Sequence, residues 1–410
     1  MEFGCIAKKL GHSFSAEIHS LIGDYDYRLC EVPGDGLDDF MRKRNFKGIN
    51  VTIPYKKDVI PYLDGMNDVA KRIGSVNTVV NRDGRLFGYN TDYFGMKALL
   101  KKAGVSVENK TVLVLGTGGT SVTAQVLSKD LGAKEVLVVS RRAGEGVITY
   151  SEAAERCRNA EVIINTTPVG MYPENYAAPI DIGLFPRLEG VADAVFNPLR
   201  TPLVLAAKKR GLSAEGGLYM LVAQAVYASE IFRDVFIDKS EIDRIFGEIL
   251  KMKQSVALTG MPGSGKSTIG KIVAKMLERE FIDLDAEIVS RVGKPITDIF
   301  AEKGEQGFRD IETEVLKDVC RRSGAVIATG GGAILRDENV EALRQNCKVF
   351  LLDRDPDWLK PTSDRPTASD REAIKKRYAE RQKRYAETAD VVIKPTDDAD
   401  LNAEMIIERL

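Results

Sequence analysis

The chain has 410 residues, of which 44% are hydrophobic and 29% are charged. This length exceeds one ordinary domain, so we expect two or three domains that each bury a core. The 59 basic and 60 acidic side chains leave a formal net charge of −1, which gives no support for nonspecific binding of nucleic acid or of an anionic membrane.

The apolar runs have the length of strands and are too short to span a bilayer. The chain does not open on a basic region followed by an apolar stretch, so no signal peptide is expected. Its five cysteines are scattered and show no CxxC spacing, which makes disulfides and a zinc site unexpected. This cysteine usage fits a reducing cytoplasm.

Four blocks dense in polar residues occupy the first hundred positions. They are residues 11–15 (GHSFS), 48–56 (GINVTIPYK), 74–78 (GSVNT) and 88–92 (GYNTD). Each block alone is compatible with ordinary turn chemistry, because Ser, Thr, Asn, Asp and Gly are the residues that turns use. A single lysine such as Lys56 is more often a surface side chain than a catalytic one.

Short apolar runs then alternate with helical patterns, at 111–115, 135–140, 162–165 and 191–196. This alternation predicts a parallel sheet covered on both faces. The first run leads into Gly116, Gly118 and Gly119, a glycine pattern that is a weak sign of dinucleotide binding alone and a better one at this βαβ spacing.

Ser140, Arg141 and Arg142 end the second run, where an NAD site typically has an acidic residue. Two guanidinium groups there favour the 2′-phosphate of NADP. The alternative is a pair of surface arginines.

Together these blocks resemble shikimate dehydrogenase over residues 1 to 245. The resemblance implies a Rossmann-type NADP domain at 101–214 and a discontinuous substrate domain at 1–100 plus 215–250. It implies that Lys56 and Asp92 are the catalytic pair for reduction of 3-dehydroshikimate by NADPH, with Met220 near the nicotinamide. The side chains implied to bind the substrate are Ser13, Ser15, Thr52, Asn77, Thr91 and Gln224. Phe196 stands where this family often has Tyr.

A second alternating series follows, with apolar runs at 255–259, 281–284, 326–329, 349–352 and 391–394. It predicts a separate α/β domain at 252–410 with a five-stranded parallel sheet. Residues 260–268 (GMPGSGKST) lie between its first run and a helical pattern, the context that a phosphate-binding loop requires.

In such a loop, backbone N–H groups wrap the phosphates of a nucleoside triphosphate, here ATP. Lys266 would reach the terminal phosphates and Ser267 would hold Mg²⁺. The residues predicted to contact ATP are Gly263, Ser264, Gly265, Lys266, Ser267 and Thr268.

Further polar groups follow at the ends of later runs. Asp283 and Asp285 lie on the same side of a strand, because side chains alternate. Arg309 belongs to residues 304–312 (GEQGFRDIE), and residues 330–332 are three glycines. Singly, these features are typical of a strand-end acidic pair, a solvated helix charge and a tight turn.

In combination, these motifs resemble shikimate kinase over residues 255 to 410. The resemblance implies that Asp283 assists Mg²⁺ and the acceptor hydroxyl and that Asp285 binds shikimate hydroxyls. Arg309 and Arg381 would pair with the substrate carboxylate, and Arg365 would be a lid arginine that neutralises the transferred phosphoryl group. Gly330, Gly331 and Gly332 would line the site. Arg377 and Arg384 compete with Arg381 for its role.

The two resemblances predict a bifunctional enzyme whose first part makes shikimate and whose second part phosphorylates it. One alternative is a quinate dehydrogenase-like first part that uses NAD. Another is that one part is a ligand-binding module without catalysis. The expected partners are small-molecule substrates, and no feature of the sequence indicates an oligomeric state.

Overall fold

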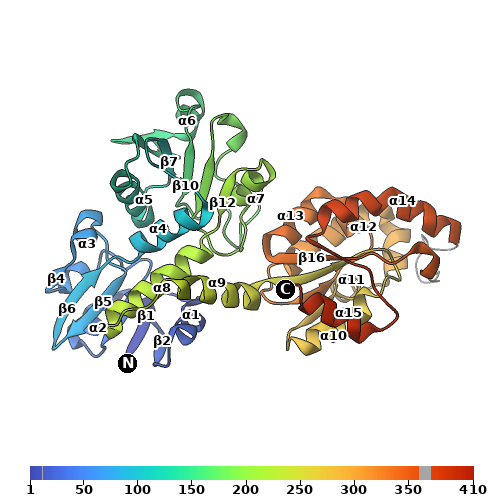
Figure 1. Ribbon diagram of the computed structural model, residues 1–410, viewed down its shortest axis with the longest axis horizontal. Coiled ribbons are helices and arrows are strands. Elements are labelled where there is room, and N and C mark those ends of the chain that lie inside the picture. Colours follow the sequence, from blue (N-terminus) through green and yellow to red (C-terminus); the bar gives the residue numbers. More distant parts are fainter. Residues whose placement is uncertain (12, 360–370) are drawn as a thin grey trace. The chain divides into compact units, whose positions relative to one another are not determined.

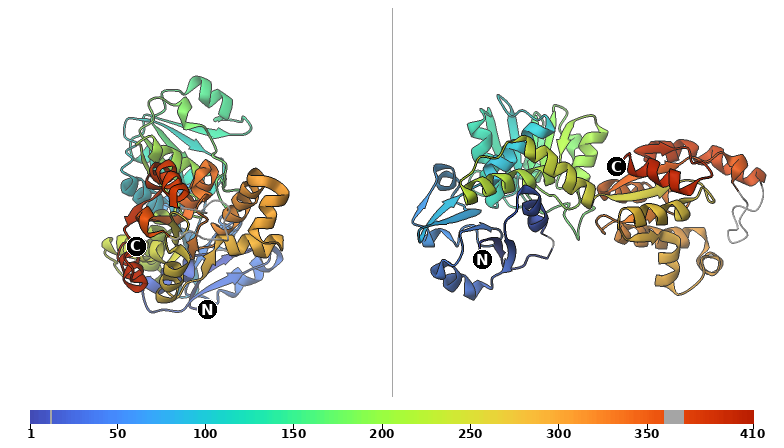
Figure 2. Two further views of the ribbon diagram at one scale, coloured as in Figure 1. Left: turned by 90° about the vertical axis from the view of Figure 1, so that its right-hand side faces the viewer. Right: turned by 60° about the horizontal axis from the view of Figure 1, so that its bottom comes forward.

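A computed structural model describes residues 1–11, 13–359 and 371–410. The chain forms two compact units, Met1–Ile249 and Leu250–Leu410, and both are of the predicted α/β class (Figures 1 and 2). In the described part of the chain, no helix is long and apolar enough to cross a membrane.

The first lobe of the N-terminal unit is a mixed sheet in the order β2-β1-β3-β5-β6-β4, drawn in blue in Figures 1 and 2. The β5–β6 hairpin turns at Asp83 and Gly84, which have φ angles of 52° and 81° and so suit a two-residue Asp-Gly turn. Its elements are β1 (Phe3–Ala7), α1 (Ser15–Ile22), β2 (Tyr27–Glu31), α2 (Leu37–Lys43), β3 (Gly48–Val51), β4 (Gly65–Met66), α3 (Asp68–Ile73), β5 (Thr78–Arg82) and β6 (Arg85–Tyr89).

The second lobe is a parallel sheet in the order β12-β11-β10-β7-β8-β9. The strand order reverses between β7 and β10, which is the arrangement of the predicted Rossmann fold. Leu113, Ile163 and Val191 on its central strands are fully buried. The lobe contains β7 (Thr111–Leu115), α5 (Gly119–Asp130), β8 (Glu135–Ser140), β9 (Val147–Thr149), α6 (Tyr150–Arg156), β10 (Val162–Asn165), β11 (Gly190–Asp193), α7 (Pro202–Lys209) and β12 (Ser213–Glu215).

Helices α4 (Asp92–Ala103) and α8 (Leu218–Arg233) pack against each other where the chain leaves the first lobe and later returns to it (Figure 1). A Cβ atom at Gly95 would lie 2.7 Å from the Met220 carbonyl oxygen, so the missing side chain is what permits this close crossing. The crossing places the start of α4 beside α8.

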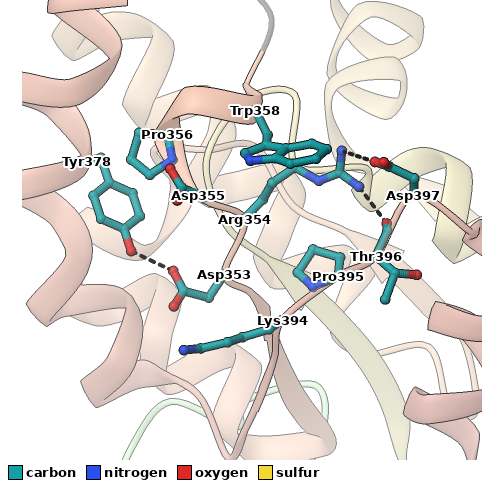
Figure 3. Close-up of a pocket in the computed structure, with 10 residues that line it drawn as sticks. All are labelled: Asp353, Arg354, Asp355, Pro356, Trp358, Tyr378, Lys394, Pro395, Thr396 and Asp397. Atoms are coloured by element: carbon teal, nitrogen blue, oxygen red, sulfur yellow. Dashed lines mark hydrogen bonds and ion pairs between the residues drawn. The ribbon is translucent and has the colours of Figure 1, made fainter.

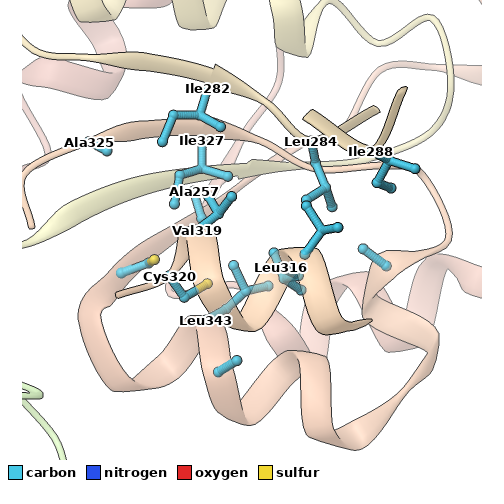
Figure 4. Close-up of a cluster of buried hydrophobic side chains, with 14 of the residues drawn as sticks. Ala257, Ile282, Leu284, Ile288, Leu316, Val319, Cys320, Ala325, Ile327 and Leu343 are labelled. Carbon is cyan, nitrogen blue, oxygen red and sulfur yellow. The ribbon is translucent and has the colours of Figure 1, made fainter. Parts of the chain in front are cut away.

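The C-terminal unit has a five-stranded sheet in the order β14-β15-β13-β16-β17, and every strand pair is parallel, as predicted. Figure 4 shows apolar side chains of the strands, such as Ile327, packed on those of the covering helices, such as Leu316 and Leu343. The elements are α9 (Ser240–Lys253), which begins in the preceding unit, β13 (Ser255–Thr259), α10 (Lys266–Met276), β14 (Phe281–Asp283), α11 (Leu284–Val292), α12 (Ile296–Val319), β15 (Val326–Ala328), α13 (Asp337–Asn346), β16 (Cys347–Leu352), α14 (Arg371–Thr388), β17 (Val391–Ile393) and α15 (Ala399–Ile407).

Candidate active sites

A cavity of 400 Å³ in the N-terminal unit is lined by residues of both lobes. Thr91 and Asp92 are buried directly behind Asn77 and are hydrogen-bonded to it. The predicted dehydrogenase residues that line the cavity are Ser13, Ser15, Thr52, Lys56, Asn77 and Gln224. Met220 is buried in α8 and is not among the lining residues.

Lys56 and Asp92 form an ion pair in which Lys56 Nζ lies 2.5 Å from Asp92 Oδ2. Lys56 follows β3 in the first lobe, whereas Asp92 is the first residue of α4, where the helix dipole favours a negative charge. The lysine side chain is 19% exposed and the aspartate 6%. One side of the Lys56 ammonium group therefore faces the cavity, and the Asp92 carboxylate binds the other side.

Asn77 orients this pair. Its Nδ2 donates to Asp92 Oδ1 at 2.9 Å and to Gln224 Oε1 at 3.3 Å, and its Oδ1 accepts from the Thr91 backbone N–H at 2.7 Å. Because Asn77 precedes β5 and Gln224 lies on α8, this amide joins three separate chain segments at the Lys56–Asp92 pair.

The cavity also contains residues for which the sequence predicted no role. Asn50 lines it and accepts a hydrogen bond from the Tyr27 hydroxyl at 2.7 Å. Its alternation with Thr52 along the chain was an available signal, because residues two apart in a strand share a face. Phe196 meets Phe14 edge-on, with ring centroids 5.4 Å apart, so an apolar wall occupies the place often held by Tyr.

The predicted cofactor residues Gly116, Gly118 and Gly119 form the turn from β7 into α5. Gly116 has a φ of 108°, and a Cβ atom there would lie 2.9 Å from Thr166 Oγ1, so only glycine fits this turn. A second cavity of 670 Å³ is lined by Thr117, Ser140, Arg141, Arg142, Gly144 and Val147. Both arginines are exposed, and no acidic side chain is among the lining residues.

The phosphate loop joins β13 to α10 in the C-terminal unit. Gly260, Gly263 and Gly265 have positive φ angles of 143°, 81° and 98°, which turn successive backbone N–H groups inward. Lys266 is buried, and its Nζ donates to the carbonyl oxygens of Gly260 and Met261 at 3.0 and 2.9 Å.

Other side chains of this loop are also placed for contacts with a ligand. The Ser264 hydroxyl is buried and has no hydrogen-bond partner among the described residues. Ser267 and Thr268 are exposed at the start of α10. The N-terminus of this helix favours negative charge, as the phosphate prediction requires.

A hydroxyl and a carboxylate meet beside this loop. Ser267 Oγ donates to Asp283 Oδ2 at 2.5 Å, and Asp283 Oδ1 caps α11 through the backbone N–H groups of Asp285 and Ala286. These are hard oxygen donors of the kind that Mg²⁺ takes together with phosphate oxygens. Within the described residues no three His, Cys, Asp or Glu side chains group to hold a metal ion by themselves.

The three glycines after β15 bring the predicted acceptor-binding groups together. A Cβ atom at Gly330 would lie 2.7 Å from Glu312 Oε1 and 3.0 Å from Asp285 Oδ1. At Gly332 a Cβ atom would overlap the Arg309 guanidinium. Larger residues at these positions would therefore displace the charged groups.

Glu312 was quoted in the sequence motif but given no role. Its Oε2 lies 2.6 Å from Arg309 Nη1, and its side chain is 1% exposed. Burial raises the pKa of Glu312, the Arg309 guanidinium opposes this, and the charge of Asp285 adds to the rise. The signal for its role was the spacing of three residues from Arg309, which places both on one helix face.

The three competing arginines of α14 have different surroundings. Arg381 Nη1 donates to the Gly331 carbonyl oxygen at 3.0 Å, which places it at the glycine turn. Arg384 bonds the Ile334 carbonyl oxygen and pairs with Asp337, so it anchors the helix. Burial and the nearby Arg381 lower the pKa of Arg377. Arg365 lies outside the described residues.

A further cavity of 560 Å³, which the sequence did not predict, opens at the ends of β16 and β17 (Figure 3). Arg354 donates to the Thr396 carbonyl oxygen, and Trp358 lines the same cavity. Tyr378 donates to Asp353 Oδ1 at 2.8 Å on the other side. β16 is the neighbour of β13 in the sheet, so this cavity and the phosphate loop share the carboxyl edge of that sheet.

Fold and site geometry define the class of protein: a nicotinamide-dependent dehydrogenase of the Rossmann type followed by a P-loop kinase. Two family models match the chain, the shikimate dehydrogenase substrate binding domain over residues 5–79 and shikimate kinase over residues 262–410. The chain belongs to the shikimate dehydrogenase family, and its C-terminal part is a shikimate kinase domain. The fusion predicted from the sequence is confirmed.

Individual relatives agree with this assignment. A shikimate dehydrogenase (NADP(+)) of Clostridium perfringens (strain 13 / Type A) is 37% identical over 265 residues, which are 60% of this chain and 97% of that protein. The crystal structure of a chorismate mutase/shikimate 5-dehydrogenase fusion protein from Clostridium acetobutylicum is 36% identical, with a TM-score of 0.57, and the match covers 60% of this chain and 96% of that one.

A shikimate 5-dehydrogenase from Thermus thermophilus, solved in complex with NADP(H) and shikimate, is 29% identical. Its TM-score is 0.55, and the match covers 60% of this chain and 99% of that one. These relatives span the N-terminal unit.

Proposed function

We propose that the chain catalyses two consecutive reactions: reduction of 3-dehydroshikimate to shikimate with NADPH, and phosphorylation of the shikimate 3-hydroxyl with ATP. The observation that carries the proposal is that each unit brings its reactive groups together. Lys56 and Asp92 meet at one cavity, and Asp285, Arg309 and the glycine turn gather beside the phosphate loop.

In the dehydrogenase unit, NADPH supplies the hydride when bound. The Lys56 ammonium stabilises the negative charge that develops on the carbonyl oxygen and donates the proton that completes the alcohol. Asp92 keeps the ammonium oriented toward the cavity, and Asn77 fixes Asp92. Ser13, Ser15 and the other polar lining residues hold the substrate carboxylate and hydroxyls.

The cavity at Arg141 and Arg142 supports NADP rather than NAD as the cofactor. Two guanidinium groups bind a 2′-phosphate well, and an NAD site would need an acidic residue for the ribose hydroxyls. The other residues assigned to the cofactor are Gly116, Gly118, Gly119, Ser140 and Met220.

In the kinase unit, Lys266 exchanges its bonds to the two loop carbonyl oxygens for bonds to the terminal phosphates when ATP binds. The loop N–H groups bind the remaining phosphate oxygens. Mg²⁺ fits the oxygen donors of Ser267 and Asp283, where it would neutralise phosphate charge. Asp283 also lies close enough to the loop to accept the proton of the acceptor hydroxyl. Arg309 and Arg381 pair with the shikimate carboxylate.

We assign the cavity of Figure 3 to the adenine base. Arg354, Trp358 and Pro395 give it planar and apolar surfaces of the kind on which a base stacks. The cavity lies at the same sheet edge as the phosphate loop.

The proposed domains are residues 1–100 plus 215–250 for the dehydrogenase substrate, 101–214 for NADP, and 252–410 for the kinase. All five cysteines are free thiols, which supports a reducing cytoplasm.

Two separate assays test the proposal on the purified, full-length chain. The first follows NADPH oxidation after addition of 3-dehydroshikimate. The second follows ADP release after addition of shikimate, ATP and Mg²⁺. We expect both activities, and absence of either in a folded sample would remove the corresponding half of the proposal.

A further inference from the structure

One backbone oxygen in the kinase unit receives two side-chain donors from the same helix. The carbonyl oxygen of Gly331 accepts from the Tyr385 hydroxyl at 2.5 Å and from Arg381 Nη1 at 3.0 Å. Tyr385 is 2% exposed and lies one helical turn after Arg381 on α14. The two side chains therefore reach the glycine turn from one helix face.

The Tyr385 phenol lies near three guanidinium groups. Burial raises the pKa of Tyr385 to about 12, although the nearby Arg381, Arg309 and Arg377 guanidinium groups lower it. The phenol thus stays neutral and keeps its proton for the Gly331 carbonyl oxygen. Arg381 and Tyr385 are therefore joined through this one shared acceptor.

The position of Gly331 affects the groups on both sides of it. A Cβ atom at Gly331 would lie 2.8 Å from Pro262 in the phosphate loop. The neighbouring glycines contact Arg309, Glu312 and Asp285, as described above. The two hydrogen bonds to Gly331 therefore fix Arg381 at the point where the phosphate loop meets the acceptor-binding groups.

We propose that Tyr385 is a positioning residue of the kinase reaction: its hydroxyl fixes the Gly331 carbonyl oxygen, which in turn holds the Arg381 guanidinium in the orientation that receives the carboxylate of the acceptor substrate. This inference rests on the proposed binding of shikimate by Arg381. The arginine has five N–H donors, so it can keep its bond to Gly331 while other donors bind a carboxylate. Without the Tyr385 hydroxyl, the Gly331 carbonyl and the guanidinium bound to it must be ordered by the substrate itself, which weakens binding.

Tyr385→Phe tests this, since it removes one oxygen and keeps the buried ring. We expect the KM for shikimate to rise about fivefold to tenfold, as loss of one hydrogen bond to a neutral carbonyl implies, with kcat and the KM for ATP within about twofold of wild type. Thr388→Val is the matched control, because it removes another buried hydroxyl of the same helix, one that bonds the Arg384 carbonyl oxygen. It should leave the shikimate KM unchanged.

A double variant separates positioning from general loss of structure. If Tyr385 acts through Arg381, Tyr385→Phe adds less than about twofold to the shikimate KM of Arg381→Ala. An unchanged shikimate KM in Tyr385→Phe, equal losses for both substrates, or full additivity in the double variant would overturn the inference. If the wild-type chain does not phosphorylate shikimate at all, the proposed function falls, and this inference falls with it.

Discussion

In the dehydrogenase unit the proposed catalytic groups bond to each other, whereas in the kinase unit Lys266 and Arg381 bond to backbone carbonyls. Arg309 is the exception there, because it pairs with Glu312. Lys56 pairs with Asp92 at 2.5 Å. Lys266 instead donates to Gly260 and Met261, and Arg381 donates to Gly331. The first site is thus already arranged for proton transfer, and the second holds its cations beside the places that anionic ligands would take.

The difference follows from the charges that the two reactions handle. A ketone is neutral until hydride arrives, so the ammonium group needs a protein carboxylate as its partner beforehand. A nucleotide and a carboxylate bring their own negative charges, and charge-assisted hydrogen bonds are stronger than those to a neutral carbonyl. Neutral acceptors can therefore hold Lys266 and still release it to the phosphates, whereas Arg381 can keep its bond to Gly331 and offer its other N–H donors to the carboxylate.

Lys56→Ala should abolish nearly all of the dehydrogenase activity. Loss of the proton donor lowers the rate of 3-dehydroshikimate reduction by about 10³-fold, within the range of general acid catalysis. Initial rates of NADPH oxidation measure it, with shikimate phosphorylation in the same sample as a check on folding. Lys57→Ala, an exposed neighbour that does not line the cavity, is the control. Near-normal reduction by Lys56→Ala would favour a different proton donor.

Lys266→Ala should lower only the kinase activity. The loop N–H groups remain, so ATP still binds weakly. The kcat for shikimate phosphorylation should fall by about 10²-fold, because the lysine charge that stabilises the transferred phosphoryl group is lost. ADP release gives the rate, and NADPH oxidation should be unchanged. Lys271→Ala changes an exposed lysine of the same helix and should behave as wild type. A full-rate Lys266→Ala enzyme would be incompatible with the proposed phosphate loop.

The double variant Arg141→Ala/Arg142→Ala tests whether the two arginines select NADPH over NADH. Removal of both guanidinium groups should lower kcat/KM for NADPH by about tenfold to a hundredfold, because bonds to a charged phosphate are lost. The value for NADH, which lacks that phosphate, should change little. Arg158→Ala, at an exposed position of the same lobe, serves as the control. Parallel losses for both cofactors would mean that the arginines do not bind the 2′-phosphate.

The smallest expected effect concerns Glu312, which holds Arg309. Because burial raises its pKa, this carboxylate takes up a proton at a higher pH than a surface glutamate does. As the pH falls from about 7 toward 5, the ion pair weakens and the shikimate KM should rise about threefold. Glu312→Gln cannot titrate, so its KM should be flatter over the same range. The same pH dependence in both proteins would exclude Glu312 as its source.

Much of the fold could be predicted from the sequence. The two series of apolar runs predicted two parallel sheets, and the glycine-rich loops after 111–115 and 255–259 were placed correctly at strand-to-helix turns. Short-range patterns suffice here, because strands, turns and helix starts are specified by neighbouring residues. Three of the four polar blocks near the N-terminus also converge, since Lys56, Asn77 and Asp92 meet in space, and Ser13 of the fourth block lines the same cavity.

Contacts between distant segments were harder to predict. Tyr385 lies in a helix rich in Lys and Arg, a pattern typical of a solvated face, yet it is buried against Gly331. The cavity at Arg354 and Trp358 forms from two strand ends that are separated by α14 in the sequence. Met220 was expected near the nicotinamide, and its burial against Gly95 reflects the crossing of α4 and α8. Each of these features depends on how whole elements pack.

The most direct test of the central claim is one reaction mixture that contains the wild-type chain, 3-dehydroshikimate, NADPH, ATP and Mg²⁺, with detection of shikimate 3-phosphate. We predict that the product forms only when both NADPH and ATP are present. Lys56→Ala should leave 3-dehydroshikimate unconsumed, and Lys266→Ala should accumulate shikimate. Consumption of 3-dehydroshikimate by the wild-type chain without formation of shikimate 3-phosphate would contradict the account.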